Sequence, residues 1–202
     1  MRHRRIGRKL GRNPSHQRQL LRSLASALFL TERDTDDLRF VKLESEPKVE
    51  GRIITTVAKA KEVRPLVEKC ITIAKKAVAS LDEARQHGTQ AQRGSEEWKS
   101  WRASDRWRQW SAAIAPAVTA RRRCVTLLGD KLAVVALFES VAPRFVDRPG
   151  GYTRIVRLAK PRLGDAGPRA ILEFVGVRDR AVTRSQRPAF DTEEAAEPVG
   201  AV

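Results

Sequence analysis

The sequence predicts an α+β fold in which one helix, a strand, about three further helices and then two strands follow a basic arm. Apolar residues recur at helical spacing over residues 20–29, 57–81 and 130–141. Short β-branched or alternating segments occupy residues 52–56, 152–158 and 170–175. Pro and Gly residues lie between the last two segments, which predicts that these segments pair as a hairpin with a long loop.

The composition indicates a polyanionic partner. The chain has 202 residues, of which 32% are charged and 5% aromatic, so its core is modest and one or two domains are expected. The net charge of +16 and the isoelectric point near 10.9 favour nucleic acid, an anionic membrane or an acidic protein. A membrane is disfavoured because no apolar run approaches the roughly 20 residues that span a bilayer. The basic N-terminus also lacks the apolar stretch of a signal peptide.

Residues 1–14 are predicted to form an extended arm. Like charges repel along it, and Gly7, Gly11 and Pro14 disfavour a helix. Nucleic acid would order such a segment, because each cation placed on a phosphate releases condensed counterions. A basic solubility or localisation tail is the alternative. Residues 1–22 contain no acidic side chain and eight basic ones, which are Arg2, Arg4, Arg5, Arg8, Lys9, Arg12, Arg18 and Arg22.

The first helix is expected to begin at Ser15 as its N-cap and to bury a stripe of leucines, with Arg18 and Arg22 outside the stripe. Residues 34–52 are acidic and predict a surface insertion, with a short strand near 38–43 as one interpretation. The strand 52–56 follows, and Thr56 can cap the next helix. Pro65 is expected to kink or split that helix, because proline removes one amide donor.

Residues 80–120 form a predicted helical insertion that contains all four tryptophans. On one helix, Trp107 and Trp110 would share a face, and Trp98 and Trp101 would point nearly the other way. Base stacking, protein docking and packing on the main body are three interpretations. The insertion has six basic and five acidic residues, so it is nearly neutral. This balance favours contact with a neighbouring protein, or a lid on the domain, rather than an RNA clamp.

The rest of the chain continues a single domain over residues 15–178. Arg121, Arg122 and Arg123 form a second basic cluster, and Asp130 can cap a helix that Pro143 is expected to end. Residues 148–152 predict a turn, which could also form an anion-binding nest of backbone amides. The tail at 179–202 is acidic and predicted to be disordered.

Catalytic or metal-binding patterns are not apparent. His3, His16 and His87 have no partner at ligand spacing, and Asp147, Asp165 and Glu173 are near one another only in sequence. Cys70 and Cys124 lie in apolar helical segments, so free buried thiols are expected, with a disulfide as the alternative. We therefore predict no enzyme activity, cofactor, metal or small-molecule substrate.

Three separated motifs carry a family resemblance. Residues 1–10 (MRHRRIGRKL) with Arg12 and His16, residues 55–64 (TTVAKAKEVR) and residues 137–155 (LFESVAPRFVDRPGGYTRI) occur in this order. Together they resemble the bacterial family of large-subunit ribosomal protein seventeen. The departures are Gln17, where the family usually has Arg, and Gly167, where Ala is usual. The insertions 34–52 and 80–120 and the tail after residue 178 have no counterpart in the short family core.

The resemblance implies a compact two-layer α/β domain with a small mixed sheet, and a structural role in translation. The protein would bind and stabilise large-subunit (23S) rRNA near the nascent-chain exit, beside other large-subunit ribosomal proteins, in the cytoplasm. The alternatives are a non-ribosomal nucleic-acid-binding protein, of the nucleoid or RNA-chaperone type, and an RNA-processing enzyme.

The predicted RNA contacts combine the arm with basic side chains of the domain. Arginine suits this role because its planar fork binds phosphate through two hydrogen bonds and stacks on bases. Recognition would depend on RNA shape and backbone more than on base edges. The candidate residues are Arg2, His3, Arg4, Arg5, Arg8, Lys9, Arg12, His16, Arg18, Arg22, Lys59, Lys61, Arg64, Arg121, Arg122, Arg123, Arg144, Arg148, Tyr152 and Arg154.

Overall fold

A computed structural model of the chain describes residues 7–34, 37–40 and 47–176. The predictions for residues 1–6, for residues 41–46 and for the tail at 179–202 lie outside the described residues. The helical elements are α1 (Pro14–Leu30), η1 (Leu38–Phe40), α2 (Val57–His87), α3 (Glu96–Ala103), α4 (Asp105–Leu128), α5 (Lys131–Ala136), the π-helical η2 (Leu137–Val141) and α6 (Ala142–Arg144). The strands are β1 (Arg52–Thr56), β2 (Thr153–Arg157) and β3 (Arg169–Phe174), which confirms the predicted α+β class.

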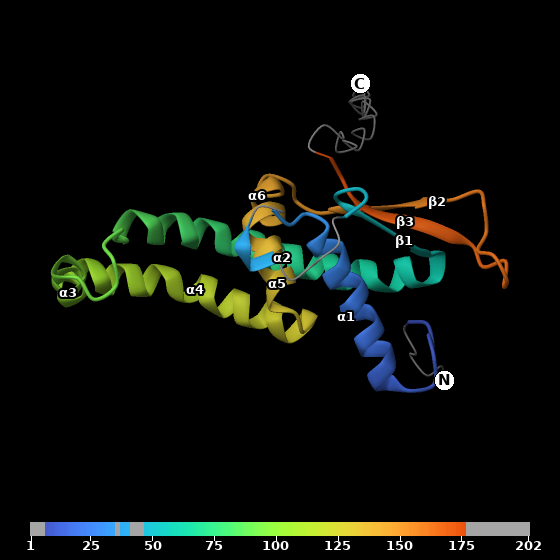
Figure 1. The fold of residues 1–202 in the computed structure, drawn as a ribbon, viewed down its shortest axis with the longest axis horizontal. Coiled ribbons are helices and arrows are strands. Elements are labelled where there is room, and N and C mark those ends of the chain that lie inside the picture. Colours follow the sequence, from blue (N-terminus) through green and yellow to red (C-terminus); the bar gives the residue numbers. More distant parts are fainter. Residues whose placement is uncertain (1–6, 35–36, 41–46, 177–202) are drawn as a thin grey trace, which may run out of the picture.

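The molecule is elongated rather than compact (Figure 1). The long helices α2 and α4 lie side by side and form a helical hairpin, with α3 at its tip. The sheet lies at the opposite end against the first half of α2, and α1 crosses beneath. None of the described helices is long and apolar enough to cross a bilayer.

The sheet is antiparallel throughout its described strands, with the order β1–β3–β2, so the expectation of a mixed sheet was wrong. The predicted hairpin of β2 and β3 is confirmed, and β1 pairs with the other side of β3. Strands β1 and β2 run in the same direction, but β3 separates them and no parallel pair forms. Strand β2 is consequently an edge strand, a position that matters for the basic surface.

The core joins the sheet to the helices. Ala170, Leu172 and Phe174 alternate along β3 and are buried, and they belong to one apolar cluster with residues of α1, α2, α4 and α5. Leu28 of α1 and Ile71 of α2 are fully buried in the same cluster. Burying a side chain of this size contributes about 1.5–3 kcal/mol before entropy costs. The cluster therefore fixes α1 and the sheet on α2.

Three local expectations need correction. Helix α1 is capped by Asn13, whose Oδ1 accepts from the Ser15 amide at 2.8 Å. Pro14 occupies the first helical position, where the backbone amide would have no partner within the helix, so its missing N–H costs nothing there. Residues 38–40 form a 3-10 helix rather than part of a strand. The helix before Pro143 does not end there: the π-helical turn η2 carries the chain into α6, which ends at Arg144.

Other local predictions are confirmed. The Thr56 hydroxyl accepts from the Lys59 amide, and Asp130 Oδ1 accepts from the amides of Leu132 and Ala133. Helix α2, however, runs through Pro65 as one element, so the expectation that Pro65 splits the helix was wrong. Cys70 and Cys124 are free, buried thiols, and Cys124 Sγ lies 4.0 Å from the carbonyl oxygen of Cys70.

Candidate nucleic-acid interface

The described part of the arm folds back onto the first half of α2. Arg8 Nε lies 3.6 Å from Glu62 Oε1, and Gln17 Nε2 donates to the Arg8 carbonyl at 2.7 Å. Gly7 has φ near +100°, and a Cβ there would lie 3.2 Å from Glu62 Oε2. A glycine is therefore favoured where the arm approaches the helix. These few exposed contacts hold the arm only loosely.

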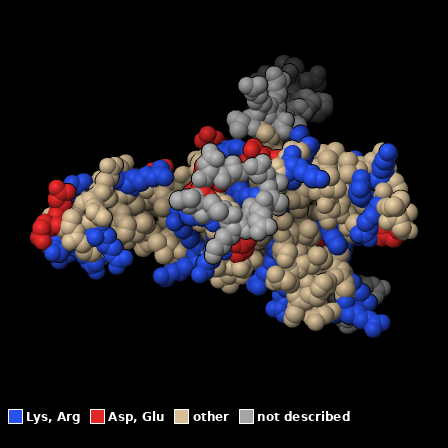
Figure 2. All heavy atoms as spheres, viewed as in Figure 1, with Lys and Arg blue, Asp and Glu red and all other residues tan. Residues whose placement is uncertain are grey.

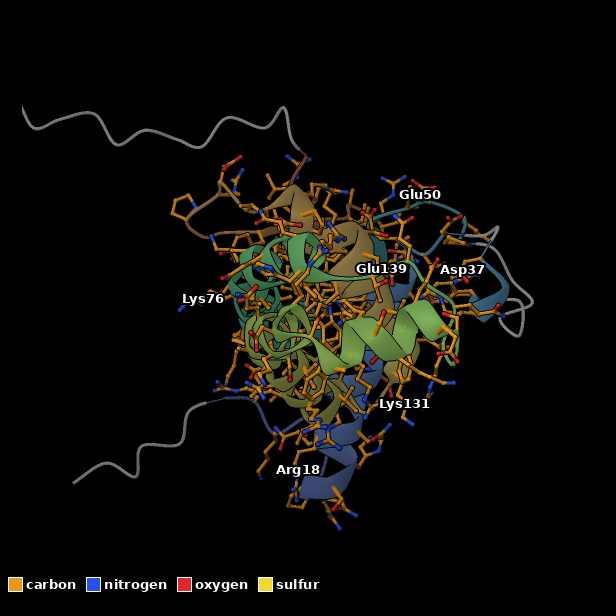
Figure 3. All side chains as sticks on the ribbon, turned by 90° about the vertical axis from the view of Figure 1, so that its left-hand side faces the viewer. Arg18, Asp37, Glu50, Lys76, Lys131 and Glu139 are labelled. Atoms are coloured by element: carbon orange, nitrogen blue, oxygen red, sulfur yellow. The ribbon has the colours of Figure 1, made fainter. Side chains whose placement is uncertain are left out.

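Beyond Arg8 the arm presents cations to solvent. Lys9, Arg12 and His16 are exposed, and Lys9 and Arg12 line an open hollow of about 900 Å³ between the arm and the start of α1. On α1 itself, Arg18 is exposed at the free end of the helix (Figure 3). Arg22 donates to the Thr126 carbonyl at 2.9 Å, so its guanidinium also ties α1 to α4.

Charge is distributed unevenly around the helices. Asp37, Glu50 and Glu139 lie on one side of the molecule, and Lys76 lies on the opposite side (Figure 3). Arg121, Arg122 and Arg123 on α4 are all exposed, and the Arg121 guanidinium lies over the Phe138 ring at 5.2 Å from its centre. On the face shown in Figure 2, acidic and basic side chains are mixed at the tip of the helical hairpin, and Lys and Arg predominate around the sheet and the end of α1.

The predicted contact residues between positions 144 and 154 also make internal interactions. The Tyr152 ring is 2% exposed and packs against Phe145 at 5.3 Å between ring centres, so we assign it to the core. Arg144 Nη1 donates to Glu32 Oε1 at 2.9 Å. Arg148 Nε donates to the carbonyls of Gly150 and Gly151, which closes the turn at 148–151. Arg154 Nε donates to Glu173 Oε1 at 2.5 Å.

Two of the three acidic residues singled out in sequence hold a loop and a strand pair. Asp165 accepts from Arg162 Nε at 2.9 Å, and Glu173 accepts from Arg154. The Arg162 side chain, followed by the Gly167 amide, lowers the pKa of Asp165 below its ordinary range. Within residues 7–34, 37–40 and 47–176, no three His, Cys, Asp or Glu side chains gather as a metal site.

The tryptophans pack on one another at the hairpin tip, which differs from the two opposed faces predicted. Ser104 is extended between α3 and α4, so α3 turns back onto α4. Trp101 then meets Trp110 edge-on at 5.5 Å, and the Arg102 guanidinium lies over both Trp98 and Trp107. Trp101 Nε1 also donates to the His87 carbonyl at 3.0 Å. The cluster is a small core for the tip.

Arg157 belongs to the basic surface but was not among the sequence candidates. It is exposed at the end of β2, near Lys61, Arg64 and Arg154, and all four line a cleft of about 530 Å³. In the sequence, Arg157 looks like any polar residue of an alternating strand, so no local signal indicated it. Lys59 is half-buried at the start of α2.

Comparisons with known proteins agree with the resemblance drawn from the motifs. The family model described as "Ribosomal protein L17" matches residues 48–175. The chain is 61% identical over 191 residues to the large ribosomal subunit protein bL17 of Rhodopirellula baltica, covering 95% of this chain and 89% of that protein. It is 35% identical to bL17 of Thermomicrobium roseum (87% of this chain, 99% of that protein) and 33% identical to bL17 of Nitratidesulfovibrio vulgaris (96% and 98%).

Proposed function

The chain belongs to the ribosomal protein L17 family, and on this premise we propose that it is a structural constituent of the large ribosomal subunit that binds and stabilises 23S rRNA. Its relatives are named as large ribosomal subunit proteins. The role is structural rather than catalytic, in line with the family. The observation that supports RNA as the partner is the arm: residues 2–12 carry six cations, and in its described part the folded domain contacts Arg8 through the Glu62 ion pair and the Gln17 hydrogen bond.

The arm would become ordered by giving its charge to RNA phosphates. An ion pair between exposed groups 3.6 Å apart contributes at most about 1 kcal/mol, so RNA can replace Glu62 as the partner of Arg8 at little cost. The exposed cations of α1 and α4 would extend the contact over the folded domain. Because arginine forks bind backbone phosphates, the protein would recognise the fold of the rRNA more than its bases.

The remaining parts of the proposal concern placement. Residues 15–178 would act as one domain that carries the arm, located in cytoplasmic ribosomes near the nascent-chain exit. The helical hairpin would extend away from the RNA-binding end towards a neighbouring ribosomal protein, since its tip mixes acidic and basic side chains.

Fractionation of a cell lysate on a sucrose gradient tests the proposal. We expect the protein to sediment with the large subunit and to remain there through a high-salt wash. A pool that sediments with DNA or as free protein would instead support the non-ribosomal nucleic-acid-binding alternative.

A further inference from the structure

The cleft between α2 and the edge strand β2 brings together basic residues that lie about 90 positions apart in sequence. Lys61 and Arg64 come from α2, and Arg154 and Arg157 come from β2. The cleft also contains Thr153 and Ile155, and no acidic residue lines it. Glu68 and Glu173 pair with Arg64 and Arg154 from outside this lining, and Lys61 and Arg157 leave the cleft of about 530 Å³ with a net positive charge.

We propose that this α2–β2 cleft binds the phosphodiester backbone of the rRNA, a contact that rests on the proposed function and locates a second RNA site apart from the arm. The sequence candidates included Lys61, Arg64 and Arg154 without placing them together, and did not include Arg157. The fold makes them one site.

Two of the cations are held by carboxylates that do not line the cleft, and Arg154 lies on the opposite face of the sheet from Thr153 and Ile155. Glu68 Oε1 accepts from Arg64 Nε at 3.0 Å and from the buried Thr153 hydroxyl at 2.9 Å, so one carboxylate links the helix to the strand. Glu173, opposite Arg154 in the strand register, accepts from Arg154 Nε. An arginine fixed through Nε still has other N–H donors for a phosphate, and its immobilisation lowers the entropy cost of binding.

The other two cations are the ones that the fold does not use. Lys61 and Arg157 are exposed, and across the part of the chain that the structure describes neither forms an ion pair. An incoming phosphate can therefore pair with them without breaking an internal contact. The cleft thus combines fixed donors with uncommitted charges.

Backbone donors of β2 also point towards the free edge of the sheet. The amide of Leu158 donates to the Arg169 carbonyl, and the amide of Val175 donates to the Tyr152 carbonyl. The even-numbered residues of β2 therefore form the hydrogen-bonded pairs with β3. In an antiparallel ladder the intervening residues direct their N–H groups away from the partner. The amides of Ile155 and Arg157 consequently face the open edge, where phosphate oxygens can accept from them.

Edge strands also carry basic residues simply to prevent pairing with another chain. That explanation accounts for Arg154 and Arg157, but it gives no reason for Lys61 and Arg64 on the facing helix. A bound peptide strand would use the same free amides but would not need four cations. The charge of the whole cleft favours a polyanion.

Filter binding to in vitro transcribed 23S rRNA of the same organism, at several salt concentrations, tests the cleft with full-length protein. The test variant is Lys61→Ala with Arg157→Ala. The matched control is Arg106→Ala with Arg108→Ala, which removes the same charge from the exposed hairpin tip. We expect equal thermal unfolding of all three proteins, since neither pair supports the core.

The cleft variant should bind at least about tenfold more weakly than wild type, and its slope of log K against log salt should fall by about 1.4–1.8. The control should match wild type in both. If wild type fails to prefer 23S rRNA to unrelated RNA, the proposed function itself is wrong. If wild type binds and the cleft variant behaves like the control, the cleft inference is overturned and the cations serve only to protect the strand edge.

Discussion

Arg39 and Glu139 form a two-pronged ion pair across 100 positions of sequence, with Nη1–Oε1 at 2.9 Å and Nη2–Oε2 at 2.6 Å. Asp37 Oδ2 accepts from Nε of the same arginine at 2.7 Å. The hydrogen bonds that Arg39 donates to Glu139 and then to Asp37 raise the pKa of Arg39. The described part of the acidic insertion is thereby attached to η2.

We expect Arg39→Ala to loosen residues 37–40 while the global unfolding midpoint changes little, because the pair is exposed and the buried Phe40 still anchors the segment. Faster amide hydrogen exchange confined to residues 37–40 would show this loosening. Arg106→Ala, an equal loss of charge elsewhere, is the control. Unchanged exchange at 37–40 would mean that Phe40 alone holds the segment.

Two loops should loosen in acid only at a pH below the ordinary pKa of an aspartate. Arg39 lowers the pKa of Asp37, and Arg162 lowers that of Asp165, through side-chain hydrogen bonds. A carboxylate with a depressed pKa in the folded state contributes its stability above its ordinary value near 3.8 and loses it as the pH falls through the folded value. Both loops should be unaffected between pH 8 and pH 5.

An NMR titration of the Gly167 amide, which donates to Asp165 Oδ1, follows this directly. Its midpoint should lie below 3.8. A midpoint at or above that value would show that Arg162 does not hold Asp165 in solution.

Removing the Trp101 side chain should loosen the hairpin tip without changing RNA binding. Trp101→Ala removes the edge contact with Trp110 and the hydrogen bond to His87, which together stabilise α3 by about 1–3 kcal/mol. Trp101→Phe keeps a ring and loses the donor, so its effect should be smaller. Hydrogen exchange in α3 measures both.

The salt dependence of 23S rRNA binding should remain at the wild-type value for Trp101→Ala and for the double variant with Trp98→Ala. Lys99→Ala, an exposed change on the same helix, is the control for protein handling. A loss of RNA affinity in the tryptophan variants would contradict protein contact as the role of the tip.

Mutating Arg144 tests whether this arginine stabilises the fold or binds RNA. Its side chain is 27% exposed, and its partner Glu32 is 13% exposed. Arg144→Ala leaves that carboxylate nearly buried without a cation and removes a guanidinium that lies over Phe145. We expect a loss of about 1–3 kcal/mol in the free energy of unfolding, measured by denaturant titration.

The double variant Arg144→Ala with Glu32→Gln should recover part of that loss, because the unpaired charge is gone. The salt slope for 23S rRNA should stay at the wild-type value in both variants. A slope lowered by about 1 would instead place Arg144 on a phosphate, as the sequence had suggested.

Sequence reasoning succeeded where the determining signal is local. Thr56 and Asp130 cap helices through their own side chains, and the alternation in residues 170–174 is enough to place Leu172 in the core. It failed where distant segments meet. Nothing near Arg144 indicates Glu32, and nothing near Trp101 indicates that Ser104 will turn α3 back onto Trp110.

The same limit applies to the basic surface. An arginine in a sequence carries no mark that separates an internal ion pair from a phosphate contact, so Arg148 and Arg154 were grouped with the arm. The α2–β2 cleft could not be predicted, because it depends on β2 taking the edge of the sheet beside α2.

Deleting residues 2–12 should separate RNA binding from folding. The deletion keeps the Asn13 cap and Pro14, so α1 can still begin. Of the contacts described for the arm, it removes the exposed Arg8–Glu62 pair and the Gln17 hydrogen bond, and the unfolding midpoint should change little. Six cations are lost: Arg2, Arg4, Arg5, Arg8, Lys9 and Arg12.

Because each phosphate contact contributes about 0.7–0.9 to the slope of log K against log salt, the slope for 23S rRNA should fall by about 4–5. A second variant, with these six residues changed to Gln, keeps the length of the arm and should behave like the deletion. If the Gln variant binds as wild type does, charge is not what the arm contributes. If both variants keep the wild-type slope of log K against log salt and still enter ribosomes, the folded domain binds the phosphates. The α2–β2 cleft then becomes the principal RNA site.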